Sequence, residues 1–356
     1  MKTPWRLRNV ESIHSMNALA AKLEKVPAAG QRLSVQVADL SAPVVRWVVI
    51  DDTHVGQRLD NFLIGLLKGA PKSLIYRVVR SGEVRVNGAR APVDQRLEVG
   101  DRIRIPPVRL ASRPSETRST RVPAVEFPVL FEDEHLMVIN KPAGVAVHGG
   151  SGVSSGVIEQ LRAARPQARM LELVHRIDRE TSGALIIARR RPTLTALHEA
   201  MRQGQVGKRY LAWTWGRWSG PAQTIRLPLL RYLTPEGERR VRVSDDGQFA
   251  GTRLKCLAVG EYPGLGPVSL MQADLETGRT HQIRVHLAHL GFPLVGDEKY
   301  GQYELNKLLD KTDHNRMFLH AFKLKFVHPV DGSSVLIEAP IPATFSAFAE
   351  ACHAPV

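Results

Sequence analysis

Residues 174–188 read VHRIDRETSGALIIA, a polar segment that runs directly into five apolar residues. The apolar run Ala184 to Ala188 predicts a buried strand, and the segment before it places Asp178 between two arginines in a loop. Loops fixed by a buried strand often carry function. A lone carboxylate in such a loop is nevertheless more often part of a surface ion pair worth less than ~1 kcal/mol. The pattern alone leaves both interpretations of Asp178 open.

Short strands and helices alternate irregularly on both sides of this segment. Residues 136–139 and 184–188 predict strands, whereas residues 157–164 and 193–202 predict helices. This mixture favours a single α+β domain over residues 125–356 rather than an array of βαβ units.

A smaller unit precedes this domain. Apolar residues recur there at helical spacing twice, first at Leu59, Phe62, Leu63, Leu66 and Leu67 and then at Leu74, Ile75, Val78 and Val79. Ser73 signals the start of the second helix and Gly82 its end. Asn87-Gly88 is typical of a hairpin turn, with a further strand through Ile103. We therefore expect a small αα-β-hairpin domain over residues 45–107.

The chain is strongly basic. Its 49 Lys and Arg against 35 Asp and Glu give a net charge of +14, which favours polyanions such as nucleic acid or an anionic membrane face. The longest apolar runs are far shorter than the ~18 residues of a membrane helix, so we expect no membrane span. Several cations must lie on the solvent side of the two small helices: Lys68, Lys72, Arg77, Arg80 and Arg85. They form either a solvated face or a patch that tracks phosphates.

The remaining segments and the cysteines indicate the cellular compartment of the protein. We expect a mostly disordered basic leader over residues 1–44 and a basic linker over 108–124. The amphipathic stretch 16–23 is a feature of organelle presequences, but Glu11 and Glu24 argue against one. Two cysteines cannot make a disulfide framework or a cysteine zinc site. We therefore expect a cytoplasmic protein.

Several common chemistries find no support. The sequence has no phosphate-loop, dinucleotide-binding or zincin motif. His281 and His286 are five residues apart, so on a helix or a strand they point to different faces, and we expect no metal site. Residues 175–178 are similar to part of a kinase catalytic loop, but the other kinase motifs are missing.

Residues 175–183 resemble the signature of the RluA-type pseudouridine synthases. Four further segments agree with the same family in the same order: residues 138–152, 208–212, 278–286 and 318–321. Residues 57–88 resemble the S4-type RNA-binding domain. The whole resemblance covers residues 46 to about 345, and it is closest to the synthase C group that acts on the large ribosomal subunit. Ile177 stands where the family usually has Leu, a change too small to threaten the chemistry.

The resemblance implies an S4-like domain followed by a larger pseudouridine synthase domain with a mixed, mostly antiparallel sheet. It implies that uridines in 23S ribosomal RNA become pseudouridines without a cofactor or a metal, and that the enzyme is a monomer. Asp178 would be catalytic, either as a nucleophile at C1′ or as a base at C2′. Arg284 would pair with Asp178, and Tyr210 would stack on the uracil. The RNA-binding residues would be the five cations above together with Arg176, Arg279 and His281.

Two other classes of protein stay open. One is an RNA-binding or ribosome-assembly factor that has lost catalysis. The other is a nucleoside or glycoside hydrolase that uses Asp178 and Glu276 as paired carboxylates. Hydrolysis releases free base, whereas isomerisation keeps uracil attached and loses only the C5 hydrogen.

Overall fold

The computed structural model describes residues 45–67, 69–108, 122–150 and 155–354. The predicted leader, most of the predicted linker and Lys68 lie outside the described residues.

The smaller part of the chain, residues 45–108, is a three-stranded antiparallel sheet with two helices. Its sheet order is β1 (Arg46–Val49), β3 (Arg102–Ile105) and β2 (Arg85–Val86), and its helices are α2 (Leu59–Leu66) and α3 (Lys72–Arg80). Both predicted helices are confirmed because their apolar stripes form one core with the inner side of the sheet. Asn87 and Gly88 both have positive φ, as a two-residue hairpin turn requires.

Two local predictions for this part were wrong or incomplete. The second helix does not start at Ser73. It starts at Lys72 after Pro71, whose fixed φ suits the helix entrance and whose missing N–H needs no partner. The strand β1 was not predicted from the sequence. Its four residues alternate in exposure, a signal too short to separate from a loop.

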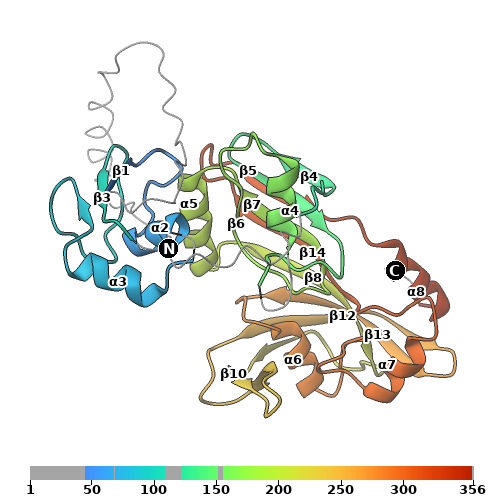
Figure 1. Ribbon diagram of the computed structural model, residues 1–356. Coiled ribbons are helices and arrows are strands. Elements are labelled where there is room, and N and C mark those ends of the chain that lie inside the picture. Colours follow the sequence, from blue (N-terminus) through green and yellow to red (C-terminus); the bar gives the residue numbers. More distant parts are fainter. Residues whose placement is uncertain (1–44, 68, 109–121, 151–154, 355–356) are drawn as a thin grey trace, which may run out of the picture. The chain divides into compact units, whose positions relative to one another are not determined.

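The larger part is built on a ten-stranded sheet with the order β4-β5-β7-β14-β8-β13-β12-β9, with β6 added to β7 and β15 to β14 (Figure 1). Its strands are β4 (Val129–Glu132), β5 (Leu136–Lys141), β6 (Glu172–Leu173), β7 (Ser182–Ala188), β8 (Gly207–Trp215), β9 (Gln223–Arg226), β12 (Gly251–Tyr262), β13 (Gly266–Leu275), β14 (Leu319–Val327) and β15 (Ser334–Glu338). Among the described strands, β7 and β14 form the one parallel pair. The mixed, mostly antiparallel sheet is therefore confirmed.

Helices cover both faces of this sheet. On one face lie α4 (Val157–Ala164) and α6 (Gln282–His289), and on the other lie α5 (Arg191–Arg202) and α8 (Ala343–Ala351). Leu185 packs with α4, whereas Ile186 packs with α5, which explains why every residue of β7 is buried. A short helix, α7 (Tyr303–Leu309), and a separate ribbon of β10 (Leu229–Leu233) and β11 (Arg239–Val243) complete the fold.

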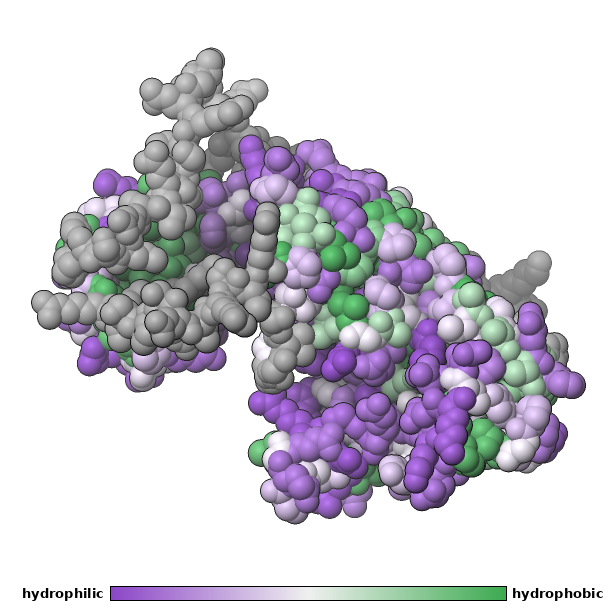
Figure 2. All heavy atoms as spheres, turned by 45° about the vertical axis from the view of Figure 1, so that its right-hand side comes forward, coloured by the Kyte–Doolittle hydropathy of each residue, from purple (hydrophilic) through white to green (hydrophobic). Residues whose placement is uncertain are grey.

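No helix within the described ranges is long and apolar enough to cross a membrane. Figure 2 shows the hydrophobic residues on one face of the molecule as separate patches among hydrophilic ones.

Candidate active site

The loop that carries Asp178 connects β6 to β7. It ends at the start of β7, where β7 pairs in parallel with β14. Gly183 pairs there with Ala321 in the parallel β7–β14 contact. Its φ is +113°, and a Cβ added at this glycine would lie 2.3 Å from the carbonyl oxygen of Ala321. Ser182 Oγ also lies 2.9 Å from Nδ1 of His320. Two segments of the family resemblance, 175–183 and 318–321, therefore meet to fix one end of the loop.

A buried lysine fixes the middle of the same loop. Lys141 is completely buried at the end of β5, and its Nζ donates to the carbonyls of Pro142 at 2.7 Å, Val145 at 2.7 Å and Arg179 at 2.9 Å. Because Arg179 follows Asp178 directly, the lysine ties the loop to β5. Burial lowers the pKa of Lys141 to about 7.

His175 fixes the start of the loop. Its Nε2 accepts the backbone N–H of Ile186 at 3.1 Å, so the segment before Asp178 is held against β7. Burial lowers the pKa of His175 to about 3, which keeps the ring neutral and able to accept this bond.

Asp178 faces a guanidinium that is itself held by a second carboxylate. Nη1 of Arg284 donates to Oδ2 of Asp178 at 3.0 Å. The Nε and Nη2 atoms of the same arginine donate to the two oxygens of Asp297, both at 2.7 Å. Burial alone would lower the pKa of Arg284, but the two carboxylates raise it, so the guanidinium stays charged. Asp297 thus aims Arg284 at Asp178 by a bidentate contact.

Tyr300 and His281 complete the surroundings of this carboxylate. The guanidinium carbon of Arg284 lies 5.1 Å from the centre of the Tyr300 ring, and the Tyr300 hydroxyl lies 2.7 Å from Nδ1 of His281. Nε2 of His281 is 3.9 Å from Oδ2 of Asp178. His281 has φ 54° at the start of α6, a left-handed backbone that is uncommon for residues other than glycine. Burial lowers the pKa of His281, while Asp178 opposes that shift.

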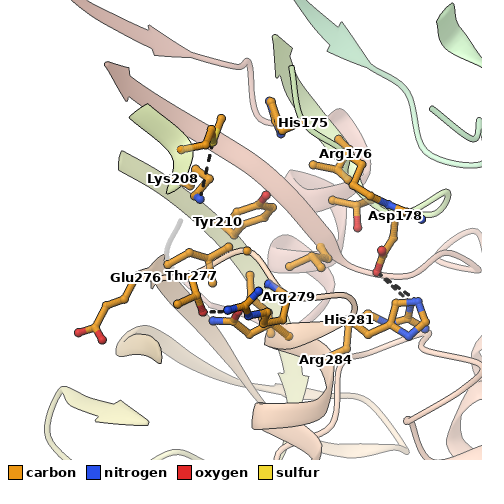
Figure 3. A pocket seen from close by; sticks show the side chains of 18 of the residues that line it. His175, Arg176, Asp178, Lys208, Tyr210, Glu276, Thr277, Arg279, His281 and Arg284 are labelled. Atoms are coloured by element: carbon orange, nitrogen blue, oxygen red, sulfur yellow. Dashed lines mark hydrogen bonds and ion pairs between the residues drawn. The ribbon is translucent and has the colours of Figure 1, made fainter. Parts of the chain in front are cut away.

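A pocket of about 460 Å³ opens in front of Asp178. Asp178 and Arg284 lie at one end of it, and Tyr210 and Lys208 lie on the wall formed by β8 (Figure 3). The Tyr210 side chain is only 7% exposed. Burial, with a smaller contribution from Asp178, raises the pKa of Tyr210 above its ordinary value, so the hydroxyl is protonated at neutral pH.

The predicted RNA-binding residues fall in two places. Arg176, Arg279 and His281 line the pocket around the three predicted catalytic residues. Four of the others lie exposed in the smaller part of the chain: Lys72, Arg77, Arg80 and Arg85. Each place carries positive charge suited to a phosphate backbone.

Glu276 lines the pocket but does not face Asp178. Arg226 donates to both of its carboxylate oxygens, at 2.9 and 3.2 Å, and Figure 3 shows the side chain directed away from Asp178. A hydrolase with paired carboxylates needs both of them at the scissile bond. The geometry therefore argues against the predicted hydrolase alternative.

The two histidines considered as metal ligands have different partners. His281 faces Asp178, whereas the buried His286 bonds to Thr252 Oγ1 and to the carbonyl of Leu227. Across the part of the chain that the structure describes, no cluster of three or more candidate ligands could hold a metal ion.

Three residues of the site were missed by the sequence analysis as functional residues: Lys141, Asp297 and Tyr300. Lys141 stands in a segment quoted for the resemblance, but its buried amine and three carbonyl partners are visible only in three dimensions. Asp297 and Tyr300 follow β13 and α6 in an irregular turn, where neither spacing nor periodicity marks them. What identifies Asp297 and Tyr300 as part of the site is their contact with Arg284.

Asp297→Asn is expected to destabilise the fold by about 3 kcal/mol and to lower turnover, because it replaces the bidentate charged contact with the buried Arg284 by a neutral amide and leaves Asp178 as its charged partner. Urea unfolding and single-turnover rates measure the two effects. Asp274→Asn is the matched control, because Asp274 bonds to Arg209 in a half-exposed pair whose loss should cost less than ~1 kcal/mol. Equal stability of the two variants would contradict the expected loss of stability. Parental turnover of Asp297→Asn would contradict the positioning role of Asp297.

The sequence and the fold match a known class of RNA-modifying enzyme. Residues 135–289 match the family model described as RNA pseudouridylate synthase, and residues 57–103 match the S4 domain. The chain belongs to the RNA pseudouridylate synthase family.

Named relatives agree with this assignment. The chain is 49% identical over 304 residues to the ribosomal large subunit pseudouridine synthase C of Escherichia coli (strain K12), which covers 84% of this chain and 94% of that protein. It is 48% identical over 302 residues to the protein of the same name from Yersinia pestis, over 84% of this chain and 93% of that one. Among solved structures, human RNA pseudouridylate synthase domain containing 1 is 29% identical with a TM-score of 0.52, over 61% of this chain and 84% of that chain.

Proposed function

We propose that the protein isomerises specific uridines of large-subunit (23S) ribosomal RNA to pseudouridine, with Asp178 as the catalytic carboxylate. The names of the relatives support the substrate, and the S4 domain supports RNA binding. The observation that carries the proposal is the carboxylate of Asp178 at one end of the pocket, held by Arg284, with the ring of Tyr210 on the pocket wall.

The reaction needs little beyond these side chains. The target uridine must leave its stack to enter the pocket, which costs a few kcal/mol. Asp178 then attacks C1′ or removes the C2′ proton, the N1–C1′ bond breaks, and uracil turns. A new C5–C1′ bond then forms. In the first route it replaces the bond between Asp178 and C1′, and in the second route Asp178 returns the proton to C2′. C5 finally loses its proton, and N1 takes one up. Arg284 holds the carboxylate in place during these steps, and Tyr210 keeps the detached base stacked.

Tritium release tests this proposal against its alternatives. RNA labelled with tritium at C5 of uridine should lose the label without releasing free uracil. Release of uracil would indicate a hydrolase, and retention of the label would indicate an RNA-binding factor without catalysis. Mapping pseudouridines in ribosomal RNA from cells that lack the protein would then identify the target positions.

We further propose the organisation that places this chemistry in the chain. An S4-type domain spans residues 45–107, a basic linker spans 108–124, and the catalytic domain spans 125–356. The matched family segments lie inside these two domains. We propose the cytoplasm as its location, because the relatives named for ribosomal RNA modification are bacterial. We propose a monomer as its working form.

The exposed cations of α3 should contribute to RNA affinity through phosphates. Replacing Lys72, Arg77 and Arg80 together by Gln removes three positive charges from one helix without touching its buried stripe. The slope of log K against log salt should flatten by about 2. Filter binding between 50 and 200 mM salt measures this slope. An unchanged slope would show that these residues are only a solvated face.

Chelators should leave the activity unchanged, because Asp178 acts through its carboxylate and the proposed steps need no Lewis acid. The test compares tritium release before and after dialysis against EDTA. A large loss that zinc or magnesium restores would show that a metal takes part.

A further inference from the structure

The sheet of the smaller part has an outer face that none of the proposed RNA contacts on α3 uses. Side chains alternate along each strand, so one face carries Val48, Val86 and Ile103 toward the core. The other face carries Trp47 and Val49 from β1, Arg102 and Arg104 from β3, and Arg85 from β2.

This outer face carries several positive charges close together, although sheets usually avoid like charges at opposite positions. Arg85 lies directly opposite Arg104 in the β2–β3 register. Like charges at directly opposite positions destabilise a sheet. The two guanidinium groups donate only to backbone carbonyls, Arg85 to Gly88 at 3.2 Å and Arg104 to Glu83 at 2.7 Å. Within the described residues no carboxylate neutralises them, so the face is suited to an external polyanion.

An exposed indole lies beside these arginines. Trp47 is 51% exposed, and the guanidinium carbon of Arg102 lies 5.3 Å from its ring centre. The other described tryptophans are at most 5% exposed: Trp213, Trp215 and Trp218. An aromatic ring flanked by cations is the combination on which unpaired bases stack while their phosphates are neutralised.

The chain's own leader is a poor occupant for this face. Residues 1–44 contain six Lys and Arg against three Asp and Glu. Two positively charged segments repel each other, whereas RNA carries one negative charge per nucleotide. The charges therefore favour RNA over the leader.

We propose that this outer face binds an unpaired segment of the RNA substrate, with a base stacked on Trp47 and phosphates held by Arg85, Arg102 and Arg104. The proposal rests on the proposed function, because it takes the same RNA as ligand. It adds a third contact surface to the cations of α3 and the pocket. A base-paired segment would not offer a free base to the indole.

Affinity and fluorescence of the full-length protein test this surface. Trp47→Ala should weaken binding of a ribosomal RNA fragment with an unpaired segment about tenfold, mainly by raising KM, while kcat at saturating RNA is unchanged. Trp47→Phe keeps a ring and should stay within about twofold. Val99→Ala is the matched control, because Val99 is 63% exposed and lies outside the sheet.

Stacking should also be visible directly. In a Trp5→Phe background, which removes the tryptophan of the leader, unpaired RNA should quench the fluorescence of Trp47, and duplex RNA of equal length should quench it less. Parental affinity of Trp47→Ala, or equal quenching by duplex RNA, would overturn the proposal. Failure of the proposed function is distinguishable, because the parent protein would then release no tritium from any RNA.

Discussion

Asp178→Asn is expected to lower pseudouridine formation at least thousandfold while leaving RNA affinity near the parental value. A thousandfold loss corresponds to about 4 kcal/mol of transition-state stabilisation. The amide is nearly isosteric, and its oxygen can still accept the 3.0 Å bond from Arg284. It has no charge with which to attack C1′ or to remove the C2′ proton. Single-turnover rates and filter binding on the same RNA separate the two effects.

Glu276→Gln is the matched control for this variant. Both residues line the pocket, but Glu276 is bonded to Arg226 and points away from Asp178. Its loss should change turnover by less than about tenfold. If the two carboxylates worked as a pair, both variants would fail to a similar extent. Turnover of Asp178→Asn within about tenfold of the parent would contradict its assignment as the catalytic group.

The elements that the sequence predicted well are those whose burial is nearly complete. The run Ala184 to Ala188 forms most of β7, which is covered by α4 on one face and by α5 on the other. The helix predicted over residues 157–164 has those bounds in the structure. Apolar periodicity records burial, so it marks such elements clearly. Ser73 shows its limit, because the rigid Pro71 decides where α3 begins.

The site was predictable only in part, because some of its residues are defined by tertiary contacts that leave no local sequence pattern. Asp178, Tyr210 and Arg284 came from the resemblance, and the structure brings all three to one pocket. Their roles stay predictions until the variants are measured. Asp297 carries no pattern of its own, because its importance comes from a bidentate contact with Arg284, thirteen residues earlier in the chain. Contacts of this kind depend on the tertiary fold rather than on local spacing.

Tyr210→Phe is expected to form little free pseudouridine while binding RNA normally. The phenyl ring keeps its face for stacking on uracil, which is worth ~1–3 kcal/mol, so substrate affinity should survive. The hydroxyl is what the variant loses. After C5 joins C1′, a base must take the C5 proton, and Asp178 acts at the sugar rather than at the base. The variant should therefore allow glycosidic cleavage and stall before product release.

The protonation state of Tyr210 sharpens this expectation. Burial raises the pKa of Tyr210, so its hydroxyl is protonated before the reaction. As it takes the proton from C5 it must give up its own, which in the overall balance is the proton that N1 of the base takes up. The Phe variant cannot relay a proton in this way, so tritium release from C5 should fall by at least a hundredfold, or about 2.7 kcal/mol. Rapid-quench sampling should reveal the stalled, label-retaining RNA. Near-parental tritium release would confine Tyr210 to stacking and assign the C5 proton to another group in the pocket.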